Sequence, residues 1–176
     1  MIAINLLNRI CQALESENLL YMVSGSIALN TYTIPRMTRD IDIVIELRKA
    51  DIDRFCKIFE TGFYIDILTV QEEVERHGMF NVIDFETGYK IDFIVRKNSE
   101  YRQLEFLRRI RTDVYGFDVW IVSIEDLIIS KIAWIQELQS DRQIDDIQNL
   151  LKNPTADKEY IKKWCEKLDF KTFNLI

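Results

Sequence analysis

The stretch Asp40-Ile41-Asp42-Ile43 alternates acidic and β-branched residues, the pattern of a β-strand with one polar and one apolar face. Residues two apart in a strand share a side, so the carboxylates of Asp40 and Asp42 point the same way, with Cα atoms about 6–7 Å apart. Two like charges repel unless a cation lies between them, and Mg²⁺ takes one or two carboxylates together with substrate phosphates. The alternative is a solvated strand edge whose acids only keep the surface soluble.

Upstream of this strand, Ser24-Gly25-Ser26 separates a short apolar run from residues 27–32, which have a helical pattern. A glycine at a strand-to-helix junction lets the backbone approach a ligand, and the helix N-terminus presents free N–H groups. Ser26 could cap the helix or bind a phosphate oxygen. A Gly-Ser turn next to paired acids therefore indicates a phosphate-handling site.

A third acid, Asp92, lies in the strand-like run 90–96, where it alternates with Ile91 and Phe93. If this strand lies beside the one that begins at Asp40, three carboxylates converge and could hold two cations. Taken alone, Asp92 reads as an ordinary surface acid. The enzymatic interpretation would fail if Asp92 lay well away from the other two acids, or if an internal ion pair buried any of the three.

The remaining chain predicts a mixed order of strands and helices followed by a helical tail. We therefore expect an α+β fold, with a mixed β-sheet core flanked by helices over residues 1–122 and a helical C-terminal subdomain over 123–176. Ser123 is a good N-cap for the first helix of that tail, with Asp126 three residues on. The expected helices are about 2–14, 27–32, 50–59, 70–76, 99–110, 124–136, 141–151 and 158–168, and the expected strands are 19–23, 40–46, 79–84, 90–96 and a hairpin over 114–122.

Composition limits the possible functions. The 23 basic and 29 acidic residues give a net charge of −6, which excludes a general nucleic-acid coating protein. Three scattered cysteines and a single histidine argue against a structural zinc site and for a reducing compartment. The apolar runs are too short to cross a bilayer, so we expect a cytoplasmic protein with no membrane association.

Together, Gly25-Ser26, Asp40-Ile41-Asp42 and Asp92 resemble the DNA polymerase β-like nucleotidyltransferase superfamily. The string Arg36-x-Thr38-x-Asp40-Ile41-Asp42 is most similar to the AbiEii-type nucleotidyltransferases of abortive infection and toxin–antitoxin systems. The resemblance covers residues 23 to about 151.

The resemblance implies roles for individual residues. Asp40, Asp42 and Asp92 would be the catalytic, metal-binding acids for Mg²⁺ or Mn²⁺, with a nucleoside triphosphate (NTP) as substrate. The nucleotide-binding residues would be Ser24, Gly25, Ser26, Arg36, Thr38, Lys131, Arg142 and Asp145.

Other interpretations remain open for three of these residues. Lys131 lies in an apolar helical stretch and would contact the triphosphate, or would extend from a helix edge to solvent. Arg142 and Asp145 stand three apart, so they could form a surface pair; the resemblance makes Arg142 a phosphate contact and Asp145 or Asp146 a supporting acid.

The expected activity is transfer of a nucleoside monophosphate to an acceptor hydroxyl, in the toxin half of a toxin–antitoxin or phage-defence pair acting on RNA, perhaps a tRNA end. An antitoxin protein would then be a partner. The basic stretch 96–111 could receive RNA or an acidic protein, although a solvated helix face is commoner. The alternatives are a catalytically silent nucleotide- or partner-binding member of the fold, and transfer to a small molecule such as an aminoglycoside.

Overall fold

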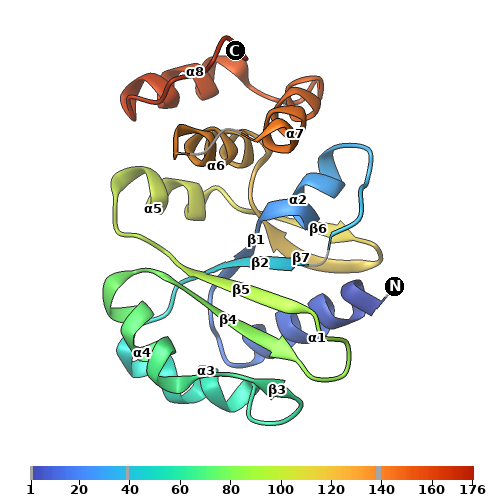
Figure 1. Cartoon of the computed structure of the whole chain (residues 1–176), viewed down its shortest axis with the longest axis vertical. Coiled ribbons are helices and arrows are strands. Elements are labelled where there is room, and N and C mark those ends of the chain that lie inside the picture. Colours follow the sequence, from blue (N-terminus) through green and yellow to red (C-terminus); the bar gives the residue numbers. More distant parts are fainter. Residues whose placement is uncertain (1, 39, 138–139) are drawn as a thin grey trace.

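A seven-stranded mixed sheet forms the centre of the computed structural model, which describes residues 2–38, 40–137 and 140–176 (Figure 1). The strand order is β3-β4-β5-β2-β1-β7-β6. Pairs β2–β5 and β1–β7 are parallel and the other four are antiparallel. The strands are β1 (Tyr21–Val23), β2 (Asp40–Ile45), β3 (Phe63–Tyr64), β4 (Met79–Asp84), β5 (Lys90–Val95), β6 (Ile110–Val114) and β7 (Phe117–Ile121). The expected α+β class is confirmed.

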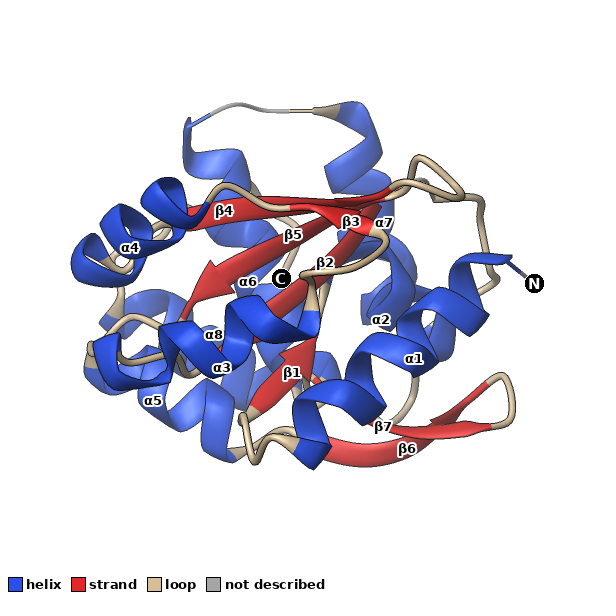
Figure 2. Ribbon diagram, turned by 90° about the horizontal axis from the view of Figure 1, so that it is seen from below, coloured by secondary structure: helices blue, strands red, loops and turns tan. Residues whose placement is uncertain are grey.

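Helices cover both faces of the sheet, with α1 and α3 on one face and α2 and α6 behind it in Figure 2. The C-terminal helices α6 to α8 gather at one end of the molecule, drawn in orange to red in Figure 1. The helices are α1 (Ile2–Ser16), α2 (Gly25–Tyr32), the short 3-10 helix η1 (Lys49–Asp51), α3 (Ile52–Ile58), α4 (Ile67–Arg76), α5 (Glu100–Leu107), α6 (Ile124–Glu137), α7 (Asp141–Leu151) and α8 (Lys158–Lys167).

Two expected boundaries were wrong and one strand was missed. Helix α5 ends at Leu107 rather than near residue 110, and Ile110 already begins strand β6, which pairs with β7. Helix α4 starts at Ile67, because the Asp66 carboxylate caps it by accepting from the backbone N–H groups of Leu68 and Thr69. The two-residue strand β3 had not been expected.

Alternation along β2 decides which face of the sheet carries the acids. Ile41, Ile43 and Ile45 are buried in a core cluster with residues of α1, α3 and α4. Val44, on the opposite face, packs against a second cluster formed with residues of α2, α5, α6, α7 and α8. Asp42 shares the side of Val44, so the acidic positions face the layer that contains α2 and the C-terminal helices. The boundary drawn at residue 122 stays a prediction.

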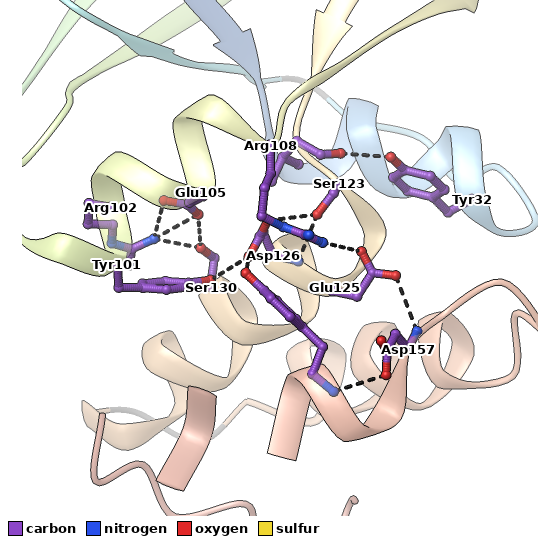
Figure 3. A network of polar contacts seen from close by, with 12 residues as sticks. Tyr32, Tyr101, Arg102, Glu105, Arg108, Ser123, Glu125, Asp126, Ser130 and Asp157 are labelled. Carbon is purple, nitrogen blue, oxygen red and sulfur yellow. Dashed lines mark hydrogen bonds and ion pairs between the residues drawn. The ribbon is translucent and has the colours of Figure 1, made fainter. Parts of the chain in front are cut away.

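A buried polar network ties α6 to its neighbours in that second layer (Figure 3). The Asp126 carboxylate is fully buried and accepts hydrogen bonds from Arg108 Nε, Ser123 Oγ, Tyr101 Oη and Tyr160 Oη at 2.9, 2.8, 3.2 and 3.1 Å. The expected Ser123 cap is confirmed, since its Oγ also accepts from the Asp126 backbone N–H. Four donors, from α5 and its C-cap, from the residue before α6 and from α8, thus meet at one carboxylate.

The arginines of the basic stretch 96–111 are engaged within the chain. Ion pairs join Arg96 to Glu46, Arg102 to Glu105, Arg108 to Glu125 and Asp126, and Arg111 to Glu15. Arg109 lies over the rings of Phe106 and Trp120 at 4.5 and 5.0 Å. Acidic and aromatic partners within the fold therefore account for the local excess of arginine.

No helix among the described residues is long and apolar enough to span a membrane.

Candidate active site

The parallel pairing of β2 with β5 brings the three predicted acids to one face of the sheet. Asp42 lies directly opposite Asp92, and Asp40 lies opposite Lys90. Directly paired residues of neighbouring strands point to the same side, so all three carboxylates share the face covered by α2. Asp40 is exposed, Asp42 is half-buried and Asp92 is buried.

The ammonium group of a lysine lies at this acidic face. Lys90 Nζ is 2.8 Å from Asp92 Oδ2, while Asp92 Oδ1 is buried and has no hydrogen-bond partner. Within the described residues, no three acidic, histidine or cysteine side chains come close enough together to hold a metal ion. A buried ion pair of this kind was expected to rule out an enzyme, and that criterion was too strict, because the pair engages only Asp92 Oδ2 and leaves Oδ1 without a partner.

The donor set nevertheless suits a divalent cation. Three carboxylates in strand register are the ligand type that Mg²⁺ and Mn²⁺ prefer, and Asp92 Oδ1 is a buried acceptor that lacks a donor. The side chains would have to turn toward one another to close on an ion. We conclude that the residues fit such an ion by type and position.

Electrostatic repulsion is concentrated on Asp42. Burial raises the pKa of its carboxyl above the ordinary value of 3.8, and the charges of Asp92 and Asp40 raise it further. Lys131 and Lys90 offset part of this effect. A half-buried carboxylate surrounded mainly by like charges destabilises the fold, which is typical of a functional position.

Gly25 brings the start of α2 against this acid. Its φ is +58°, and a Cβ placed on it would lie 1.8 Å from Asp42 Oδ2. The Ser24 backbone N–H donates to the Asp42 carbonyl oxygen at 2.9 Å and fixes the same contact. Only a residue without a side chain allows the helix N-terminus to approach the carboxylate this closely.

The two serines of the turn do different things. Ser24 occupies the N-cap position of α2, although its side chain makes no capping bond. Ser26 lies inside the helix and does not cap it; its Oγ accepts a hydrogen bond from Arg36 Nη2 at 3.1 Å. Of the two uses expected for Ser26, the capping one is thus wrong.

Replacing Gly25 with alanine is expected to lower the free energy of unfolding by about 1–3 kcal/mol, because the methyl group displaces Asp42. Thermal melting measures the effect. Gly88→Ala is the matched control, since Gly88 has a φ of +70° but open space around its Cβ position. Equal behaviour of the two variants would contradict the close contact as the cause.

A buried charge cluster forms another wall of the site. Asp146 accepts two hydrogen bonds from Arg36 and one from Lys131 Nζ, at 2.8–3.1 Å. Lys131 is 6% exposed and also donates to Gln143 Oε1, so it does not extend to solvent. Burial lowers the pKa of Lys131, whereas Asp146 opposes that effect. Burial alone would raise the pKa of Asp146, but its bonds to Arg36 and Lys131 hold it below the ordinary value.

The loop before β2 is held by local hydrogen bonds. The Asn30 side chain bonds both the backbone N–H and the carbonyl oxygen of Arg36, at 3.0 and 2.8 Å. Thr38 Oγ1 lies 3.1 Å from the carbonyl oxygen of Asp40. These bonds position the guanidinium of Arg36 between α2 and α7.

A pocket of about 460 Å³ opens between these elements. The residues that line it are Ser26, Arg36, Met37, Thr38, Asp40, Asp42, Arg142 and Gln143. Six of them had been singled out from the sequence. Of the other predicted residues, Ser24, Gly25, Asp92 and Lys131 contact lining residues or their partners, whereas Asp145 is exposed on α7 and its neighbour Asp146 makes the ion pairs.

Comparison with known proteins identifies the fold. Neither a protein-family model nor a curated protein sequence matches the chain. Among solved structures, the solution structure of the antibiotic-resistance factor ANT(2'')-Ia matches with a TM-score of 0.68 and 15% identity, over 96% of this chain and 91% of that one. A putative nucleotidyltransferase from Thermotoga maritima matches with a TM-score of 0.53 and 13% identity, over 94% of this chain and 93% of that one. The chain therefore has the nucleotidyltransferase fold. A crystal structure of ANT(2'')-Ia with adenylyl-2''-tobramycin gives a TM-score of 0.68 at 13% identity over 96% and 98% of the two chains.

The lincosamide antibiotic adenylyltransferase LnuA with bound lincomycin also matches, with a TM-score of 0.55 and 15% identity. It covers 79% of this chain and 90% of its own.

Two contributors to the site of this nucleotidyltransferase fold were missed from the sequence. Gln143 holds Lys131, and its position depends on how α7 packs on α6. Lys90 could have been found, because it stands two residues before Asp92 in an alternating strand and so shares its face.

Proposed function

We propose that this chain is a metal-dependent nucleotidyltransferase that moves a nucleoside monophosphate from an NTP to an acceptor hydroxyl. The observation that carries this proposal is the registered pair Asp42–Asp92 against the positive-φ Gly25, with Asp42 lining a pocket that also contains Arg36 and Arg142. Acids, a helix N-terminus and arginines around one polar pocket are the groups that phosphoryl transfer uses.

Different residues would bind the triphosphate and the divalent ion. Backbone N–H groups in the first turn of α2, together with Arg36 and Arg142, hold and neutralise the phosphates. Lys131 adds positive charge behind them. Asp40, Asp42 and Asp92 would hold the divalent ion, which when bound supplies Lewis-acid stabilisation of the phosphoryl charge.

In the transfer step, the acceptor oxygen forms a bond to the α-phosphorus while the bond to the bridging oxygen breaks and pyrophosphate leaves. A base next to the acceptor hydroxyl must accept its proton. We assign this proton to the carboxylate of Asp92, directly or through the bound ion.

For the acceptor, we propose RNA, in the setting of a toxin whose antitoxin is a partner protein. This part rests on the similarity of residues 36–42 to the AbiEii-type pattern. A small cationic molecule such as an aminoglycoside is the second candidate. It is favoured by the full-length structural match to ANT(2'')-Ia and by the internal pairing of the arginines in 96–111.

A transfer assay tests activity and acceptor together. The purified chain is incubated with each α-labelled NTP, Mg²⁺ or Mn²⁺, and either total RNA or a panel of aminoglycosides. The proposal predicts metal-dependent label on RNA, accompanied by pyrophosphate and absent with chelator. Label on an aminoglycoside would support the second candidate, whereas nucleotide binding with no pyrophosphate under any condition would identify a silent member of the fold.

A further inference from the structure

We propose that Lys90 is a positioning residue, an internal counter-cation that holds Asp92 in the metal-free chain and gives up Asp92 Oδ2 to an incoming divalent ion. The inference rests on the proposed function, because it concerns the ion that this function requires. The inference goes beyond that function by assigning a role to a residue outside the acid trio, which is Asp40, Asp42 and Asp92.

The position of Lys90 in the sheet places it among the acids. It is the first residue of β5, lies opposite Asp40 in the register and stands two residues from Asp92 on the same face. Its ammonium group is therefore surrounded by acidic neighbours on its own strand and on β2. As a result, its ammonium nitrogen lies 2.8 Å from Asp92 Oδ2.

The two partners of the ion pair differ in exposure, so the lysine can leave while the carboxylate stays in place. The side chain of Asp92 is 10% exposed and that of Lys90 is 42% exposed, so the carboxylate is fixed inside while the ammonium is on the solvent side. Lys90 follows the turn that contains Gly88, and its four-carbon side chain can swing outward without disturbing the strand. Asp92 Oδ1 stays without a donor even when Lys90 is in place.

The same pair explains why acids in register do not already form a ligand cluster. One of Asp92's oxygens is bonded to Lys90, and no three ligand side chains are gathered among the described residues. An incoming cation must compete with the ammonium for that oxygen. Lys90 thus weakens ion binding and, in return, spares the metal-free chain an uncompensated charge on Asp92.

The test measures binding of Mn²⁺ alone, without nucleotide, from the paramagnetic resonance signal of the free ion. Lys90→Met should bind Mn²⁺ about tenfold more tightly than the wild type, since a positive charge beside the ion is removed. Lys90→Arg, which keeps the charge, should bind within about threefold of the wild type. Lys49→Met is the matched control, because it removes a lysine from an exposed pair with Glu75 and should leave the affinity unchanged.

A second measurement uses the wild type, in case Lys90→Met does not fold. In a crystal structure with Mn²⁺, Lys90 Nζ should lie more than 4 Å from Asp92 Oδ2, and an intact contact would overturn the inference. Unchanged or weaker Mn²⁺ binding by Lys90→Met would also overturn it while leaving the proposed function standing. Failure of the wild type to bind Mn²⁺ at all would overturn both.

Discussion

Asp42→Asn is expected to reduce nucleotidyl transfer about 1,000-fold or more and, in the same molecule, to raise the melting temperature of the metal-free chain. The loss would follow from the metal-binding role that we propose for Asp42 together with Asp40 and Asp92. The gain follows because an ionised Asp42 is destabilised by burial and by Asp92 and Asp40, and the neutral amide avoids that cost. A transfer assay and thermal melting without divalent ions measure the two effects.

The stabilisation should depend on pH in a defined direction. The pKa of Asp42 is higher in the folded chain than the ordinary 3.8, so the folded chain binds its proton more readily than the unfolded chain does. The penalty is therefore present in full above the folded-state pKa and disappears below 3.8, where the carboxyl is protonated in both states. The advantage of Asp42→Asn should shrink accordingly as the pH falls.

Asp118→Asn is the control for this variant, since Asp118 is an exposed strand acid on β7, outside the pocket. It should change neither activity nor melting temperature appreciably. Transfer by Asp42→Asn at more than a tenth of the wild-type rate would show that the acid trio is not the catalytic centre. A lower melting temperature for Asp42→Asn at neutral pH would contradict the charge repulsion assigned to this position.

Asp126→Ala is expected to lower the free energy of unfolding by about 3–5 kcal/mol. The substitution removes the acceptor of four hydrogen bonds and leaves Arg108 without its closest carboxylate (Figure 3). Urea unfolding followed by circular dichroism measures the change.

A graded series separates the carboxylate from its donors. Tyr101→Phe and Tyr160→Phe each delete one hydrogen bond to Asp126 and should cost about 1 kcal/mol. Asp118→Asn again serves as the exposed control. If Asp126→Ala cost no more than a single tyrosine substitution, the network would not be what joins α5, α6 and α8.

Much of the site could be predicted because it depends on strand periodicity. The alternation in residues 40–45 gives the strand and its two faces, and the alternation around Asp92 gives the second acidic strand. Their adjacency was a hypothesis, which the parallel register of β2 and β5 confirms. Lys90 follows the same rule, since it stands two residues before Asp92 and shares its face, so the sequence carries the signal for it.

Features that depend on tertiary packing were harder to predict. The helical pattern of α7 could not distinguish Asp145 from Asp146, because the choice depends on the salt bridges to Arg36 and Lys131, which are 110 and 15 residues away in the sequence. The end of α5 was placed too late, because Arg108 and Arg109 continue an acceptable helical pattern until β6 pairs with β7. The charge excess in 96–111 gave no sign of its internal partners.

The central claim is that three strand acids and a glycine-bearing helix start form a cation-dependent nucleotide site. The most direct measurement is a crystal structure with Mn²⁺ and a non-hydrolysable NTP analogue, recorded at a wavelength that gives anomalous signal from manganese. The account predicts an anomalous peak bounded by Asp42 and Asp92, with the triphosphate against the first turn of α2. Manganese bound elsewhere, or a triphosphate away from Gly25 and Ser26, would contradict it.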